Sequence, residues 1–176
     1  MADVQSAILG GGCFWCLEAV YQRVKGVKQV TSGYAGGQIA GPSYEQVSSG
    51  TTGHAEVVKL DFDPKVITLG QILEIFWHIH DPTTPNRQGG DVGRQYRSII
   101  LYQDEEQKAA AEESLKAAEE LWDQPVVTEL KPLEAFYPAE DYHQDYFNQH
   151  PEAAYCQIVI NPKLAKFQTQ FESLLK

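Results

Sequence analysis

The chain has 176 residues, enough for one well-filled core, so we predict a single domain over residues 1–176. Its net charge of −10 argues against nucleic acid and against an anionic membrane surface as partners, and no stretch approaches the length of a transmembrane helix. The three cysteines are an odd number, which does not suit a secreted disulfide framework, and Asp3 stands where a signal peptide would be basic. We therefore expect a cytoplasmic protein.

The first motif along the chain is GGGCFWC at residues 10–16, which follows a short apolar run. Apolar residues then recur with the spacing of one helix face, at Leu17, Val20, Tyr21 and Val24. The pattern predicts a strand, a glycine turn and a helix that carries Cys13 in its first turn. Unpaired N–H groups at a helix start favour a thiolate, and the Cys-x-x-Cys spacing to Cys16 lowers the pKa of the first thiol further. We predict that Cys13 is reactive.

Two other readings of this motif are open. A free cysteine is often a buried packing residue, and a glycine turn can serve only close packing. A zinc site needs four ligands, but only Cys156 and five scattered histidines remain. We favour a reactive site without metal, because the glycines, the helix start, the second cysteine and the aromatic pair Phe14 and Trp15 coincide.

A long polar loop and a clear strand follow. Residues 27–34 read as a strand, and residues 35–53 are rich in Gly, Ser and Thr and hold Tyr44; loops of this length are usually functional. Alternation over residues 54–62 predicts a half-buried strand, and Glu56 has the parity of its apolar face. Burial without a cation would keep Glu56 protonated near neutral pH. An edge position, where Glu56 reaches water, is equally compatible with the parity.

The second half of the chain continues the pattern. Thr68 and Gln71 form a capping box that opens a helix. We expect the remaining elements in this order: a polar loop at 81–93, a strand at 95–102, an exposed helix at 104–122, an extended segment at 126–136, a short helix after Pro138, a last strand in which Cys156, Ile158 and Ile160 alternate, and a final helix capped by Asn161. The order β-α-β, β-α-β up to residue 102 predicts an α+β fold. It is a two-layer, split β-α-β (ferredoxin-like) core with extra C-terminal helices.

Six motifs together resemble peptide methionine sulfoxide reductases of the A type. They are GGGCFWC, GYAGG at Gly33, PSYEQV at Pro42, TGHAE at Thr52, FWHIHDPTTPNRQGGDVGRQYRS at Phe76 and EDYHQDY at Glu140. The resemblance covers roughly residues 7 to 155, and the joint specificity of the motifs is high.

The resemblance implies roles for individual residues. Cys13 matches the nucleophile that attacks the sulfoxide sulfur, and Glu56 matches the acid that protonates the sulfoxide oxygen. Tyr44 and Tyr96 match tyrosines whose hydroxyls hydrogen-bond that oxygen, and Asp91 matches an aspartate that positions substrate. The family also implies selectivity for the S epimer, free or within proteins, and requires no cofactor.

The aromatic and remaining cysteine residues complete this assignment. Phe14 and Trp15 match the walls of an apolar pocket for the S-methyl group. The sulfenic acid left on Cys13 needs a second thiol, and thioredoxin or a similar dithiol would reduce the resulting disulfide. Many members have Gly where Cys16 stands and carry a Gly-rich tail with recycling cysteines. Here only Cys156 has a tail-like Tyr-Cys context, so Cys16 is our preferred resolving thiol and Cys156 is the alternative.

Three other functions fit parts of the sequence. A thioredoxin-like disulfide oxidoreductase would use the Cys pair but leave Glu56 and the tyrosines without a role. A cysteine hydrolase would need His54 or His143 as base. A binding module would explain an aromatic pocket but not a thiol at a helix start.

Overall fold

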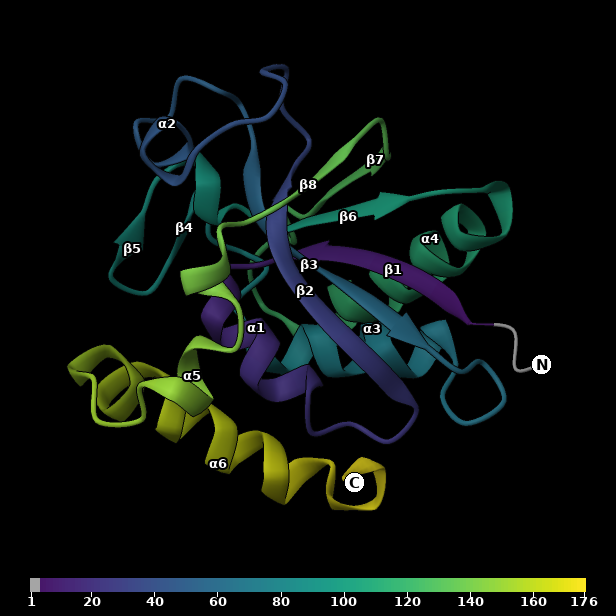
Figure 1. The fold of residues 1–176 in the computed structure, drawn as a ribbon. Helices are drawn as coiled ribbons and strands as arrows, with labels where there is room; N and C mark the ends of the chain where they lie inside the picture. Colours follow the sequence, from purple (N-terminus) through teal and green to yellow (C-terminus); the bar gives the residue numbers. More distant parts are fainter. Residues whose placement is uncertain (1–3) are drawn as a thin grey trace.

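A computed structural model describes residues 4–176. A curled six-stranded sheet runs through it in the order β7-β6-β1-β3-β2-β8 (Figure 1). Its strands are β1 (Gln5–Gly10), β2 (Val27–Ala35), β3 (Ala55–Phe62), β6 (Ile99–Tyr102), β7 (Glu129–Pro132) and β8 (Phe136–Pro138). The helices are α1 (Phe14–Tyr21), α2 (Tyr44–Ser48), α3 (Leu69–Ile79), α4 (Glu105–Leu121), α5 (Tyr146–Gln149) and α6 (Asn161–Gln170). A separate hairpin pairs β4 (Arg87–Gln88) with β5 (Asp91–Val92).

The central strand β3 decides how Glu56 is placed. It pairs antiparallel with β1 on one side and β2 on the other, and Glu56 lies opposite Tyr34 of β2. A residue of a central strand cannot reach water past a sheet edge. The inward reading of Glu56 is therefore confirmed, and the edge reading is wrong.

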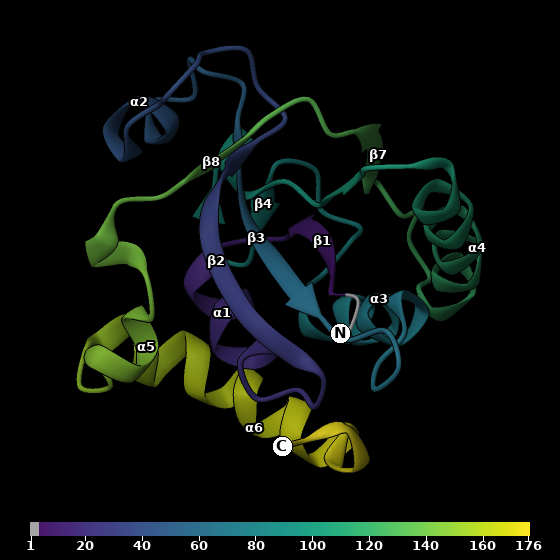
Figure 2. The ribbon, with the colours of Figure 1, turned by 45° about the vertical axis from the view of Figure 1, so that its right-hand side comes forward.

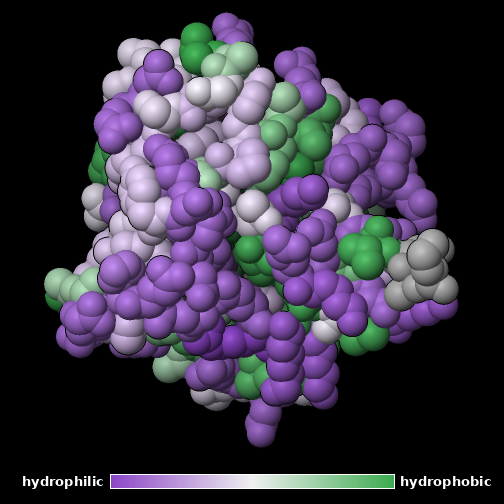
Figure 3. All heavy atoms as spheres, viewed as in Figure 1, coloured by the Kyte–Doolittle hydropathy of each residue, from purple (hydrophilic) through white to green (hydrophobic). Residues whose placement is uncertain are grey.

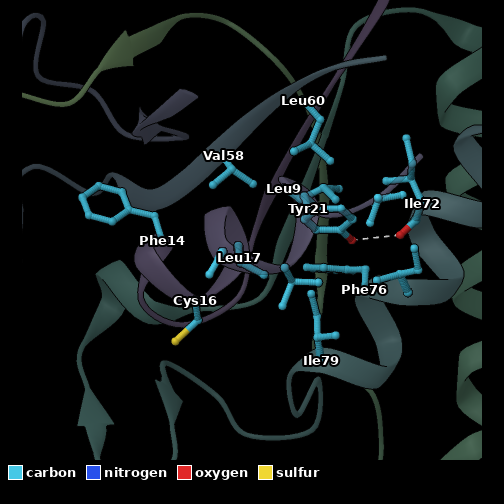
Figure 4. Packing of buried hydrophobic residues seen from close by; sticks show 14 of the residues in the cluster. Leu9, Phe14, Cys16, Leu17, Tyr21, Val58, Leu60, Ile72, Phe76 and Ile79 are labelled. Carbon is cyan, nitrogen blue, oxygen red and sulfur yellow. Dashed lines mark hydrogen bonds between the residues drawn. The ribbon is translucent and has the colours of Figure 1, made fainter. Parts of the chain in front are cut away.

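Helices α1 and α3 pack against one face of the sheet and form the main core. Leu9 of β1 and Leu60 of β3 meet the apolar face of these helices (Figure 4). The Tyr21 hydroxyl donates a hydrogen bond of 2.9 Å to the Ile72 carbonyl, which ties α1 to α3. On the other face, a smaller cluster around Val57 is covered by the connection from β7 to β8. The expected α+β class is confirmed.

Polar side chains cap the starts of helices α2, α3 and α4. The side chain of Thr68 accepts a hydrogen bond from Gln71 N–H, and the Gln71 side chain accepts from Thr68 N–H, so the predicted capping box is confirmed. The long loop after β2 contains α2, which opens with a second capping box between Ser43 and Gln46. At the start of α4, the Asp104 side chain accepts a hydrogen bond from Gln107 N–H.

The predicted C-terminal strand is wrong. Cys156–Ile160 forms a π-helix that continues into α6. The predicted cap by Asn161 is also wrong, because α6 begins at Asn161 and no side-chain hydrogen bond caps its start. Ile158 is 73% exposed, so the alternation at these positions does not reflect a buried strand face. The buried residues instead recur at helical spacing, at Cys156, Ile160, Leu164 and Phe167.

Two further boundaries differ from expectation. The strand predicted over 95–102 begins only at Ile99, because Arg94–Tyr96 forms a 3-10 turn. Helix α1 ends at Tyr21 rather than near Gly26, whose φ of +88° marks a turn before β2. Both boundary errors have the same cause: the turn next to the element carries residues that pack against the core as the residues of the element do.

The C-terminal helices close one side of the molecule. Figure 2 shows α5 and α6 below α1, with which both make contact. Figure 3 shows hydrophilic side chains over most of the viewed face, with apolar residues in small separate groups. Within residues 4–176, no helix combines the length and the apolar character needed to cross a bilayer.

Candidate active site

The glycine turn brings Cys13 beside the central strand. A Cβ on Gly10 would lie 2.8 Å from the Glu56 carbonyl oxygen, so only glycine allows β1 and β3 to approach this closely. Gly12 has a φ of +87°, and a Cβ there would lie 2.9 Å from the Gln88 Cγ. The turn therefore requires these glycines, and it delivers Cys13 to the start of α1.

Cys13 is the N-cap residue of α1 and is 9% exposed. Burial raises the pKa of its thiol well above the ordinary value, and the neighbouring Glu56 and Cys16 raise it further. The backbone N–H of Trp15 acts in the opposite direction but does not prevail. The prediction of a thiolate in the resting protein is thus wrong, because desolvation outweighs the helix start. Resting Cys13 is a thiol.

Glu56 is 1% exposed and faces the start of α1. Its Oε1 accepts a hydrogen bond of 3.2 Å from Phe14 N–H, and its carboxyl group interacts with the Cys13 thiol. Burial raises its pKa to about 8, and the negative charge of Asp91 contributes in the same direction. Within residues 4–176 no cation lies within 4 Å of this carboxyl group. At neutral pH Glu56 is mostly a carboxylic acid, which can donate a proton.

The two predicted tyrosines lie around this pair. Tyr44 begins α2, and its N–H donates a 3.0 Å hydrogen bond to Glu140 Oε2. Tyr96 lies in the turn before β6, and its carbonyl accepts a 3.1 Å bond from Gly12 N–H. Burial raises the pKa of both hydroxyls, and the charges of Glu56 and Cys13 raise it further. Both hydroxyls are therefore neutral donors within electrostatic reach of the site.

Tyr155, which was not among the predicted site residues, contacts both Asp91 and Cys16. Tyr155 donates a 2.7 Å hydrogen bond to Asp91 Oδ2, and its oxygen lies 3.7 Å from Cys16 Sγ. Because Tyr155 directly precedes Cys156, the C-terminal helical segment lies against the site. The Tyr-Cys pair was the available signal in the sequence, but only the fold identifies its contacts.

The two aromatic residues after Cys13 differ in surroundings. Phe14 is fully buried and packs against Tyr34 and His143, with ring centroids 5.8 and 5.2 Å from its own. Trp15 stays partly exposed and stacks on Tyr146 at 3.7 Å with nearly parallel rings. Trp15 thus presents surface next to Cys13, whereas Phe14 supports it from the core.

A strap at residues 139–148 holds this aromatic group in place. The Gln144 side chain bonds both the N–H and the carbonyl of Ser32 in β2, each at 2.9 Å. Glu140 accepts from the Tyr34 hydroxyl at 2.9 Å as well as from Tyr44 N–H. The sequence motif EDYHQDY marked this segment, but its individual contacts join residues more than 90 positions apart and could not be predicted.

All three thiols are free and buried. Burial raises the pKa of Cys16 and Cys156, and the charge of Lys163 partly offsets this at Cys16. Cys16 lies close enough to both other cysteines to raise the pKa of each thiol. Cys16 is therefore the thiol that lies near both of the others.

The histidines do not supply a base for Cys13. His54 accepts from Gly37 N–H and bonds the Ile39 carbonyl, so both its ring nitrogens are engaged elsewhere. Neither nitrogen of the buried His143 has a hydrogen-bond partner within the described chain. Neither histidine therefore makes the hydrogen bond to Cys13 that the base of a cysteine hydrolase would make. Among residues 4–176, no cluster of three or more His, Cys, Asp or Glu side chains has the geometry of a metal site.

A buried thiol beside a protonated carboxylic acid, with neutral tyrosines around both, defines a cysteine-dependent enzyme that couples sulfur chemistry to proton transfer. Comparison with known proteins agrees. The family model for peptide methionine sulfoxide reductase matches residues 5–175. The chain belongs to the peptide methionine sulfoxide reductase family and is an enzyme.

Individual relatives extend this finding. The chain is 60% identical to peptide methionine sulfoxide reductase MsrA of Sulfolobus acidocaldarius over 168 residues, or 96% of each chain. It is similar to the crystal structure of reduced Mxr1 from Saccharomyces cerevisiae, with a TM-score of 0.82, 34% identity and coverage of 88% and 90% of the two chains. Mxr1 in complex with Trx2 gives a TM-score of 0.59 at 26% identity, covering 82% of this chain and 86% of that one.

Proposed function

We propose that this chain reduces methionine S-sulfoxide, free or within proteins, to methionine. The observation that carries the proposal is the pairing of the Cys13 thiol with a Glu56 carboxyl group that is neutral at pH 7. Thiol–disulfide exchange proceeds by attack of a thiolate on sulfur and breaks no bond to oxygen, so it does not require an acid that protonates one. A sulfoxide reductase needs one, because the oxygen must be protonated as its bond to sulfur breaks.

In the proposed step the Cys13 sulfur attacks the sulfoxide sulfur. Glu56 gives its proton to the sulfoxide oxygen and then takes up the proton of Cys13, so that the carboxyl group returns to its neutral form. The oxygen ends as a hydroxyl on Cys13, and methionine leaves. Cys13 is thereby oxidised from thiol to sulfenic acid while the substrate sulfur is reduced by two electrons.

The groups around this pair supply binding and selectivity. Tyr44 and Tyr96 would donate hydrogen bonds to the oxygen, and neutral hydroxyls are suited to that role because charge grows on the oxygen in the transition state. Trp15, supported by Phe14, would contact the S-methyl group, and Asp91 would position the substrate. Fixed places for methyl and oxygen leave one face of sulfur open to Cys13, which favours the S epimer.

Recycling needs a second thiol and an external dithiol. The sulfenic acid on Cys13 condenses with the Cys16 thiol, releasing water and forming a disulfide, which a thioredoxin-like dithiol reduces by exchange. The complex of Mxr1 with Trx2 supports this choice of reductant. Cys156 is the alternative resolving thiol and would have to leave its helix.

We also propose that the chain acts as one catalytic domain in the cytoplasm. The strand order β6-β1-β3-β2, with α1 and α3 as crossovers, supports a split β-α-β core within that domain. Three free cysteines support a reducing compartment.

The test is consumption of racemic methionine sulfoxide with dithiothreitol, followed by chiral chromatography. We expect methionine to form until half of the racemate is used, with the R epimer left. Insulin reduction and ester hydrolysis, measured in parallel, should stay at background. Equal loss of both epimers would contradict the proposed pocket, and insulin reduction without methionine formation would favour a disulfide oxidoreductase.

A further inference from the structure

The loop before α2 is anchored by a histidine that takes no part in the proposed chemistry. Gly37 N–H donates a 3.0 Å hydrogen bond to His54 Nδ1, and His54 Nε2 lies 2.7 Å from the Ile39 carbonyl oxygen. The first bond requires Nδ1 to be an acceptor, so the proton is on Nε2, where it can be donated to Ile39. One neutral tautomer of buried His54 therefore satisfies both bonds.

The close approach of the loop to His54 requires glycine at position 37. A Cβ on Gly37 would lie 2.3 Å from His54 N and 2.5 Å from the Thr52 carbonyl oxygen, so no larger residue fits the approach. Gln38 N–H also bonds the Thr52 carbonyl at 3.0 Å. The loop around Ile39 is otherwise exposed to solvent. The His54 ring thus provides the buried side-chain anchor of a loop that has little core of its own.

Tyr44 lies five residues beyond Ile39, at the start of α2. Its own N–H is held by Glu140, and its ring packs on His143 at 4.4 Å. The return end of the loop is also held, because Arg97 donates a 2.9 Å hydrogen bond to the Gly53 carbonyl. His54 therefore fixes the incoming end of the segment that carries Tyr44.

We propose that His54 is a positioning residue: its Nδ1 accepts a hydrogen bond from Gly37 N–H and its Nε2 donates one to the Ile39 carbonyl, and together these bonds hold the Tyr44 hydroxyl where it can reach the sulfoxide oxygen. This inference rests on the role proposed for Tyr44. It differs from a purely structural role, because its effect on the rate must pass through the Tyr44 hydroxyl.

The test is a double-mutant cycle on the rate of methionine release in a single turnover. His54→Phe removes both hydrogen bonds and keeps the ring, and we expect about a tenfold slower rate, as for the weakening of neutral hydrogen bonds. In a Tyr44→Phe background the same change should cost less than about twofold, because the hydroxyl to be positioned is gone. His54→Asn keeps an acceptor near Nδ1 and His54→Gln keeps a donor near Nε2, and both should fall between wild type and His54→Phe.

The control is His78→Asn on α3, a histidine whose Nδ1 bonds the Glu74 carbonyl of its own helix, and it should leave the rate unchanged. If His54→Phe does not fold, the Asn and Gln variants complete the cycle. An equal loss in both backgrounds overturns the positioning role of His54 and leaves Tyr44 as proposed. A Tyr44→Phe protein with the wild-type rate overturns the role of Tyr44 and the inference with it.

Discussion

Cys13 and Glu56 owe their protonation states to burial. Removing a carboxyl group from water disfavours its charged form, and no cation within residues 4–176 compensates Glu56. The same desolvation keeps Cys13 as a thiol, against the pull of the helix start. The pair can therefore hold two protons at neutral pH, and attack on substrate must be coupled to proton transfer between them.

We predict that Glu56→Gln slows methionine release in a single turnover by about a hundredfold to ten-thousandfold, because Gln has similar shape but delivers no proton. The wild-type rate should fall as pH rises through about 8, since the acid form of Glu56 is lost there. Rapid-quench measurement over pH 6 to about 9.5 tests both points. The exposed α4 variant Glu112→Gln is the control. A near-normal rate for Glu56→Gln would make Glu56 a packing residue.

At the scale of elements, the start of α1 sets which thiols can meet. Cys16 N–H donates a 3.1 Å hydrogen bond to the Cys13 carbonyl, so the two cysteines belong to one helical turn. Cys156 begins a π-helix that is continuous with α6, and its side chain is fully buried. A bridge to Cys156 would require unwinding of ordered helix, whereas Cys13 and Cys16 need only a local change.

We therefore predict a Cys13–Cys16 disulfide after one turnover. Reduced protein is treated with one equivalent of methionine sulfoxide, free thiols are alkylated, and the bridges are mapped by mass spectrometry. The Cys13–Cys16 peptide should dominate, with Cys156 alkylated. A dominant Cys13–Cys156 bridge would contradict this and would mean that the C-terminal helix opens during the reaction.

Helix α1 also carries a buried acid that the proposed reaction does not use. Glu18 is 1% exposed, and burial raises its pKa from 4.5 to about 7, although the backbone N–H groups of Asp145 and Tyr146 oppose the shift. Between these pH values the folded protein holds more protons at Glu18 than the unfolded chain. Its contribution to stability is therefore present below pH 4.5 and is lost as pH rises through about 7.

We predict that Glu18→Gln leaves the free energy of unfolding nearly unchanged at pH 5 and raises it at pH 8 by on the order of 2 kcal/mol. Urea unfolding at the two pH values is the measurement. Glu112→Gln, which removes an equal charge from the exposed face of α4, should change neither value appreciably. Equal effects of Glu18→Gln at both pH values would show that ionisation is not the cause.

The sequence predicted these elements unevenly, for physical reasons. Local signals were sufficient for β3, whose alternation reflects its two faces, and for α3, whose capping box is complete within four residues. The alternation at Cys156, Ile158 and Ile160 led to the wrong prediction of a strand. Three apolar residues are compatible with either a strand or a helix, and only the exposure of Ile158 in the structure decides between them. The short length of the pattern is the cause of this error.

Over the whole molecule, the site draws on segments far apart in the chain. The start of α1 supplies Cys13, β3 supplies Glu56, the loop before β3 supplies Tyr44, and the segment around β5 and the turn before β6 supplies Asp91 and Tyr96. Motif resemblance could propose roles for these residues because it compares complete sites. It could not assign Tyr155 or Gln144, whose importance follows from contacts that only the fold creates.

The central claim is that the Cys13 sulfur attacks the sulfoxide, and a single-turnover assay without reductant tests it most directly. Wild type, Cys16→Ser and Cys156→Ser should each release about one equivalent of methionine from methionine S-sulfoxide, because only the attacking sulfur is needed for the first product. Cys13→Ser should release none. Release of methionine by Cys13→Ser, or its loss in Cys16→Ser while Cys13 remains intact, would contradict the assignment of Cys13 as the nucleophile.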